Sequence, residues 1–453
     1  MSFLVYDLAF LVLFTLFVII FLYINRKNLK REGIMYLYRT KLGIRFINYV
    51  GGKYKKTLNV LQYFAIVSGY LLMAGIFYVL IKTIYIYFAT PQITQIIKAP
   101  PVVPLLPYFP ALFGLQSFFP NFYFIYFIIV ILVMATVHEF SHGIFARFNK
   151  IKIKSTGFGF LGPILAAFVE PDEKQMRKKS NLAQMSILSA GTFANVITAA
   201  FFLIIMYFVF LGFFHPVGVF IDGYSYSILN KSDVLVTGGM LSIDGVNLTK
   251  ISYENRSYFA DLSTNFSKIA AFQDLPAINK VLRGAITQID GKSITGYNDI
   301  ANIIGNHSAG DKVSLTTNYN NREQTYNITL GKSYFNKNSS AIGVLFQINQ
   351  GNFANKVLDI LFFYKQTGVY YKSGEVAGFI YGLLFWLVLI NFFGAIFNML
   401  PLGIFDGGRF FFLTFLAITK KEKTAVRINK YMSYLIALIF FLLVFSWILA
   451  LFS

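Results

Sequence analysis

Two histidines and a glutamate stand together in the stretch ATVHEFSHGIF, residues 135–145. His138 and His142 are four residues apart, so on a helix they lie one turn apart on one face, with Glu139 beside them. Imidazoles at this spacing can bind Zn²⁺, and the glutamate can take a proton from the attacking water. The alternative is a pair of helix-face histidines that only bond to their neighbours. The metal site is favoured because an unpartnered carboxylate is costly in an apolar segment.

Two histidines leave a catalytic zinc site incomplete, because such a site has three protein ligands and one open position. The chain has no cysteine, and its other two histidines, His215 and His307, lie in a long polar segment. A carboxylate is therefore expected as the third ligand. Asp406, in FNMLPLGIFDGG, is one candidate, although Asp before Gly-Gly is also common as a turn residue or helix N-cap. The other candidates belong to a basic loop: Glu170, Asp172 and Glu173.

Long charge-free runs define the class of protein. The chain of 453 residues is 56% hydrophobic and 13% charged, whereas soluble domains carry roughly 25% charged residues. Most of the runs exceed the ~20 apolar residues that span a bilayer. We expect a polytopic α-helical membrane protein with about six transmembrane helices. The runs are 8–24, 57–81, 99–137, 180–221, 376–405 and 431–453.

Basic residues are unevenly distributed between these runs. Ten Lys and Arg fall between residues 26 and 56, eight in 143–184 and six in 406–430. The positive-inside rule places these three segments in the cytoplasm and segment 214–373 outside. The same distribution explains the net charge of +20 without a nucleic-acid partner, so the lipid bilayer is the expected partner.

The domain organisation follows from these patterns. We expect a two-helix membrane region with a basic cytoplasmic loop (1–90), a first part of the membrane core (91–213), an extracytoplasmic α+β domain (214–373), and a second part of the core with the last span (374–453). Within 214–373, the pattern LPAINKVLRGAITQIDGKSIT resembles a PDZ domain. An earlier stretch, TGGMLSIDGVNLT (237–249), echoes RGAITQIDGKSIT (283–295). It is either a second, degenerate copy or an insertion within one domain.

Two apolar stretches are too rich in glycine or proline for regular helices. Residues 156–173, TGFGFLGPILAAFVEPDE, are expected to form a hairpin or loop that dips towards the membrane, where protein or a water-filled cavity must cover its backbone. The proline-rich stretch 91–121 is expected to form an external or re-entrant connection.

The two separated motifs together resemble the site-2 protease family of intramembrane metalloproteases. In that family HExxH lies on one transmembrane helix, and Asn-x-x-Pro followed by Asp-Gly lies on a later one. The resemblance implies that His138, His142 and Asp406 are zinc ligands and that Glu139 is the general base. It also implies that Asn398 steadies the scissile carbonyl or the developing oxyanion. One departure is Phe405, where the family usually has leucine before the aspartate.

A further family element, Gly-Pro-x-x-Asn, resembles GTFAN in the fourth span. Gly191 and Asn195 keep their places, whereas Thr192 replaces the proline. The resemblance implies close helix packing at Gly191 and a polar group, Asn195, near the site; Asn also serves simply to join helices. In the family, a membrane hairpin like 156–173 helps to receive the substrate.

The expected function is that of an intramembrane zinc metalloprotease. Single-pass transmembrane proteins are the expected substrates, including ones already trimmed by another protease, and the PDZ-like domain would select them by binding a C-terminus. The high Ile, Lys and Asn content suggests the plasma membrane of a prokaryote, with an archaeon as a guess. Two alternatives remain: a membrane metalloprotease whose third ligand is a downstream Glu, and a non-catalytic transporter or scaffold with a vestigial or sensory metal site.

Overall fold

The structure is a computed structural model of the whole chain, and it describes residues 3–452 except 34, 90–104, 117–118, 163, 264–265, 321, 336–338 and 347–361. The chain forms two compact units. The membrane unit comprises residues 1–208 and 378–453, and the β-rich unit comprises residues 209–377. Each unit is considered by itself below.

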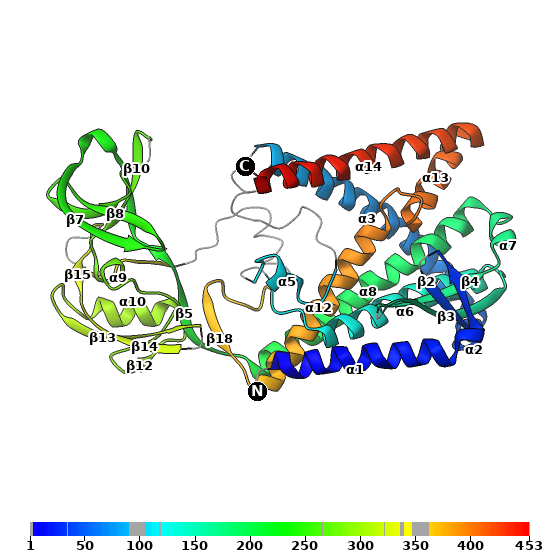
Figure 1. Cartoon of the computed structure of the whole chain (residues 1–453), viewed down its shortest axis with the longest axis horizontal. Helices are drawn as coiled ribbons and strands as arrows, with labels where there is room; N and C mark the ends of the chain where they lie inside the picture. The colour runs from blue at the N-terminus through cyan, green and yellow to red at the C-terminus, as the bar shows by residue number, and fades with distance from the viewer. Residues whose placement is uncertain are drawn as a thin grey trace. The chain divides into compact units, whose positions relative to one another are not determined.

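Six helices of the described residues are long and apolar enough to cross a membrane, which confirms the expected number (Figure 1). A helix of 20 residues already spans the hydrocarbon core of about 30 Å. Short helices, α2 (Ile44–Lys53), α7 (Glu173–Arg177) and α13 (Asp406–Thr419), lie between them in the chain. The six helices are α1 (Phe3–Ile24), α3 (Lys55–Ala89), α6 (Phe124–Phe148), α8 (Asn181–Phe213), α12 (Glu375–Asn398) and α14 (Glu422–Phe452).

Two helix boundaries differ from the ends of the charge-free runs. The third run begins at residue 99, but α6 begins only at Phe124 and continues past the HEFSH motif. Much of the proline-rich stretch 91–121 lies outside the described residues, and its described part contains the short helix α5 (Phe109–Leu112). The fifth run reaches residue 405, but α12 ends at Asn398. Pro401 follows three residues later and disfavours a helical residue before it.

The expected hairpin at 156–173 is present as β3 (Ile153–Leu161) and β4 (Ile164–Pro171), which pair antiparallel. Two further strands, β1 (Leu29–Glu32) and β2 (Met35–Thr40), extend it into a four-stranded sheet of order β1-β2-β3-β4. The basic segment after the first span thus folds onto a hairpin more than 100 residues away in the sequence. In Figure 1 this sheet lies beside α2 and α7 at one end of the membrane helices.

The first span is joined to α6 through a buried carboxylate. Asp7 is 2% exposed, and its oxygens accept hydrogen bonds from the backbone N–H groups of Phe124 (2.7 Å) and Ile125 (3.0 Å). The hydroxyl of Tyr108 donates to the same carboxylate at 2.5 Å. A carboxylate at this end of a helix satisfies unpaired N–H groups and complements the helix dipole.

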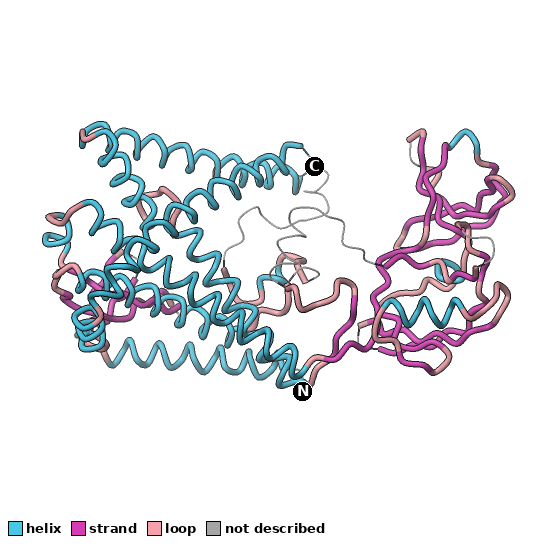
Figure 2. The backbone as a smooth tube through the Cα atoms, turned by 180° about the vertical axis from the view of Figure 1, so that it is seen from behind, coloured by secondary structure: helices cyan, strands magenta, loops and turns pink. Residues whose placement is uncertain are grey.

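The β-rich unit contains two main sheets (Figure 2). A seven-stranded sheet has the order β14-β13-β11-β5-β17, with β12 paired to β11 and β18 to β5. Helices α9 (Pro276–Asn279) and α10 (Tyr297–Gly305) accompany it. Its strands are β5 (His215–Tyr224), β11 (Ala285–Ile289), β12 (Lys292–Ser293), β13 (Lys312–Tyr319), β14 (Arg322–Thr329), β17 (Val344–Phe346) and β18 (Val369–Lys372), and a separate pair is β15 (Gly331–Lys332) with β16 (Ser340–Ala341).

The second main sheet has five strands in the order β6-β10-β9-β8-β7 and is inserted in the chain between β5 and β11. Its strands are β6 (Tyr226–Asn230), β7 (Leu235–Ile243), β8 (Val246–Tyr253), β9 (Arg256–Ala260) and β10 (Lys268–Gln273). The echo at 237–249 forms the β7–β8 hairpin of this sheet, whereas 283–295 forms β11 and β12 of the other. The echo therefore belongs to an insertion with its own small core around Ile251 and Tyr258.

Candidate metal centre

Helix α6 carries the two histidines into the interior of the membrane unit. His138 and His142 are 7% and 9% exposed, and their ring centroids lie 4.5 Å apart. Next to His142, α6 packs closely against α2 and strand β4. A Cβ added at Gly143 on α6 would lie 3.0 Å from Ile47 on α2 and 3.0 Å from Val169 on β4. The two imidazoles are thus held on a helix that is packed on several sides.

Asp406 reaches the histidines because the chain turns sharply after α12. The turn covers residues 399–405, and α13 begins at Asp406 itself, so the aspartate is the first residue of a separate helix. Gly407 allows this turn to close, since a Cβ there would lie 2.2 Å from the backbone of Met399. The Asp-Gly pair thus combines a donor atom with a backbone that can approach closely.

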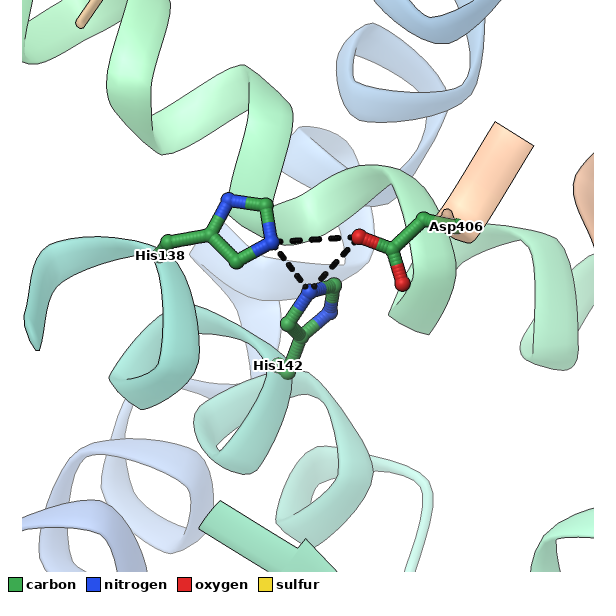
Figure 3. Close-up of side chains that lie close together, drawn as sticks. All are labelled: His138, His142 and Asp406. Atoms are coloured by element: carbon green, nitrogen blue, oxygen red, sulfur yellow. Dashed lines mark hydrogen bonds and ion pairs between the residues drawn. The ribbon is translucent and has the colours of Figure 1, made fainter. Parts of the chain in front are cut away.

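Three donor atoms from α6 and α13 converge on one point (Figure 3). The Nε2 atoms of His138 and His142 are 2.9 Å apart. Oδ2 of Asp406 lies 3.1 Å from the first and 3.2 Å from the second. Zinc–ligand bonds of about 2.0–2.2 Å place tetrahedral ligand atoms about 3.3 Å apart. Two imidazoles and one carboxylate fit a zinc ion with one open position. Among the described residues, these three form the group of His, Asp and Glu side chains that could hold a metal ion.

The second nitrogen of each imidazole has a buried partner. Nδ1 of His142 lies 2.6 Å from the carbonyl oxygen of Ile187, to which it can donate, and this leaves the Nε2 lone pair for a metal. Nδ1 of His138 lies 3.2 Å from Nδ2 of Asn195. Asn195 is fully buried, and its Oδ1 has no partner within the described part of the chain. A half-turn of the amide brings Oδ1 to a protonated Nδ1, which is the tautomer that a metal at Nε2 requires.

Glu139 lies between the centre and the sheet. Its Oε2 accepts a hydrogen bond from the backbone N–H of Val169 on β4 at 3.0 Å. Glu139, His142 and Asp406 all line a cavity of about 920 Å³, which β4 and α7 also border. The glutamate therefore faces the same cavity as two of the three donor residues.

Asn398, the residue expected at the scissile carbonyl, ends α12. Its side chain makes no hydrogen bond to any residue that the structure describes, and it does not line the cavity. One turn earlier, Gly394 packs on Met134, which lies one turn before His138. Gly382 likewise packs on Tyr126, so α6 and α12 run in the same direction and Asn398 lies near the level of His138. Its role stays a prediction.

The other carboxylates considered for the third ligand have different partners. Glu170 accepts from the hydroxyl of Ser155 at 2.6 Å and pairs with Arg39 at 3.4 Å. Asp172 caps α7 by accepting from the backbone N–H of Gln175 at 3.1 Å, which lowers the pKa of its carboxyl. Glu173 pairs with Arg177. The geometry thus favours Asp406 among the four, although metal binding itself stays a prediction.

Three residues near the centre were not predicted from the sequence. Two of them act through backbone groups, the carbonyl of Ile187 and the N–H of Val169. Backbone groups are the same in every residue type, so the sequence could not indicate them. The third residue is Arg409, which lines the cavity. Its position three residues after Asp406 places it on the same helix face, and this spacing could have been noticed.

The described residues combine six helices that are apolar enough to cross a membrane with two buried histidines, a partly buried aspartate and a neighbouring glutamate. This combination is typical of membrane metallopeptidases. The chain belongs to peptidase family M50, the site-2 protease family, whose sequence model matches residues 126–444. The match confirms the resemblance to the site-2 protease family that the motifs HEFSH and NMLPLGIFDGG indicated.

Comparisons with individual proteins add little to this assignment. No curated protein matches the chain. Among solved structures, the PDZ domain of the SdrC-like protein from Listeria innocua is similar at 26% identity, covering 17% of this chain and 89% of that domain, with a TM-score of 0.16. A TM-score this low carries no argument about the fold of the β-rich unit.

Proposed function

We propose that the protein is a zinc endopeptidase that hydrolyses peptide bonds of transmembrane segments within the membrane. The observation that supports this most directly is the meeting of His138, His142 and Asp406 beside Glu139 in a membrane protein of family M50. A bound zinc ion would polarise the scissile carbonyl and lower the pKa of water to about 7. His138, His142 and Asp406 would hold the ion.

Glu139 would accept the proton of the attacking water and deliver it to the leaving amine. Asn398 would direct its amide N–H at the developing negative charge. Asn195 would act as a positioning residue, because it contacts His138 and not the substrate. Strand β4 is the edge of its sheet and borders the cavity, so an extended substrate segment can lie there. A helical substrate must first unwind, since its hydrogen bonds shield the carbonyl.

We also propose that the centre lies near the cytoplasmic face of a prokaryotic plasma membrane and the β-rich unit outside. The distribution of basic segments supports this orientation through the positive-inside rule. Water then reaches the site from the cytoplasm. We further propose that the β-rich unit is PDZ-like and selects single-pass substrates whose outer part has been trimmed, by adding the free C-terminus as a strand.

The test uses the full-length protein reconstituted with a tethered single-pass substrate. Glu139→Gln should lower cleavage at least about a hundredfold while the zinc content stays that of the wild type. Glu422→Gln, which removes an exposed carboxylate at the start of α14, is the matched control and should cleave normally. Normal cleavage by Glu139→Gln would remove Glu139 as the general base. A wild type that binds zinc but does not cleave would overturn the protease proposal and favour a transporter or scaffold with a sensory metal site.

The third ligand is tested separately by metal analysis. Asp406→Ala should lose most of its zinc and its activity, because two imidazoles alone bind the ion far more weakly. Asp172→Ala, on a carboxylate that only caps α7, should keep both. Undiminished metal and activity in Asp406→Ala would remove Asp406 from the site.

A further inference from the structure

Arg409 has an unusual setting for a cation. It lies on α13, three residues after Asp406, and lines the same cavity as Glu139 and His142. The side chain is partly buried. Its guanidinium donates to the amide oxygen of Gln184 at 2.9 Å and touches the sulfur of Met176 at 4.0 Å. Both partners are uncharged.

In the described part of the chain, no carboxylate forms an ion pair with Arg409, whereas the neighbouring acids are already engaged. Glu32 and Glu170 pair with Arg39, and Glu173 pairs with Arg177. A guanidinium has five N–H donors in a planar fork that matches a carboxylate. A partly buried charge without a counter-ion is costly, so an anion that enters the cavity gains from pairing with it.

Six basic and five acidic side chains line the cavity, so its wall carries a small excess of positive charge. Lys154 on β3 and Lys174 on α7 line it, and neither forms an ion pair in the described residues. These two exposed lysines attract anions to the mouth at long range, while Arg409 provides the partly buried donor behind them. Gln184, which is 6% exposed, holds the guanidinium in place because its own amide N–H donates to the carbonyl of Lys179 at 2.9 Å.

We propose that Arg409 forms a carboxylate-binding subsite beside the metal centre. The inference rests on the proposed function, since hydrolysis adds water across the peptide bond and leaves a carboxylate on one fragment and an amine on the other. The carboxylate has two sources: the new C-terminus of the product, or an Asp or Glu side chain of the substrate. Arg409 thus contributes to product retention in the first case and to sequence preference in the second.

Peptide binding to the full-length Glu139→Gln protein in nanodiscs, measured by fluorescence anisotropy, tests the subsite without cleavage. The probes share one apolar sequence and differ in one group: a free C-terminal carboxylate, a C-terminal amide, or an amide with one internal Glu in place of Gln. We expect a carboxylate probe to bind about tenfold more tightly than the plain amide, as for a charge-assisted hydrogen bond. Arg409→Gln should bring this ratio to about one.

The matched control is Arg427→Gln, which removes the same charge from an exposed position on α14 outside the cavity. It should keep the full ratio, and Arg409→Lys should keep part of it. If the Glu139→Gln protein shows no preference for either carboxylate, or if adding Arg409→Gln to it leaves the preference, the proposal is wrong. Preference for the free C-terminus assigns the subsite to product, and preference for the internal Glu assigns it to a substrate side chain.

A second variant covers the case in which Arg409→Gln does not fold. Gln184→Glu supplies an internal counter-ion and keeps the contact between α8 and α13. It loses the hydrogen bond to the Lys179 carbonyl but gains an ion pair with Arg409, and it should abolish the carboxylate preference. A preference that survives this change contradicts the subsite. The proposed function fails independently, through a wild type that does not cleave its tethered substrate, and a carboxylate preference would still be measurable then.

Discussion

Gly191 determines how closely α8 approaches the metal centre. A Cβ built there would lie 2.5 Å from Nε2 of His142 and 2.7 Å from Cε1 of His138. These distances are far below van der Waals contact, and the imidazoles cannot retreat because Ile187 and Asn195 hold their other nitrogens. The glycine is thus required by the rings and not by its own backbone conformation.

Gly191→Ala should therefore displace an imidazole and lower the zinc content and activity at least about tenfold, as changes around metal ligands do. Gly212→Ala is the matched control, because it lies on the same helix with open space around its Cβ position. Metal analysis and a cleavage assay check both variants, with melting temperatures recorded in parallel. Wild-type zinc content in Gly191→Ala would show that the rings can move aside.

At the scale of elements, the centre depends on where α6 begins as much as on where it ends. The carboxylate of Asp7 fixes the first turn of α6 through two backbone N–H groups. The HEFSH motif lies on the last turns of the same helix. A helix is stiff along its axis, so a contact at one end helps to set the position of the histidines at the other.

Asp7→Ala should destabilise the membrane unit by about 1 kcal/mol or more, the usual cost of losing an N-terminal cap. Asp7→Asn keeps one acceptor oxygen and should cost less. Tyr108→Phe, which removes only the hydroxyl donor of the same cluster, should cost less than Asp7→Ala as well. Thermal unfolding in detergent measures all three, and an Asp7→Ala protein that melts with the wild type would show that the contact contributes nothing.

At the scale of the whole molecule, the β-rich unit is an insertion whose two ends meet. The chain enters it through β5 and leaves through β18, and these strands pair so that His215 lies opposite Lys372. Residues paired in this way have Cα atoms about 5 Å apart. The insertion can therefore be replaced by a short linker between residues 214 and 373.

Such a deletion should leave zinc binding and cleavage in place but bring the rates on trimmed and untrimmed substrates close together, because the proposed selecting surface is gone. Rates on a matched pair of tethered substrates, long and short on the outside, measure this. The same deletion with Glu139→Gln should be inactive, which shows that the cleavage comes from the metal centre. A deletion protein that discriminates as well as the full chain would rule out selection by the β-rich unit.

Features that depend on local pattern could be predicted from the order of residues alone. Runs without charge predicted six membrane helices, because a bilayer requires about 20 apolar residues in succession. The spacing of His138 and His142 predicted two donors on one helix face, because residues four apart are neighbours on a helix. Glycine and proline in 156–173 predicted a hairpin or loop there, and the structure has the hairpin.

Which distant groups meet could not be predicted in this way, because it depends on how the elements pack. The residues alone left four carboxylates open as the third donor. The turn after α12 brings Asp406 to the histidines, whereas Glu170 pairs with Arg39. Packing also accounts for three other features: the cap from Asp7, the addition of β1 and β2 to the hairpin, and the cavity at Arg409. Contacts between residues tens or hundreds of positions apart are set by how helices and sheets pack, and periodicity within one element carries no information about its partner.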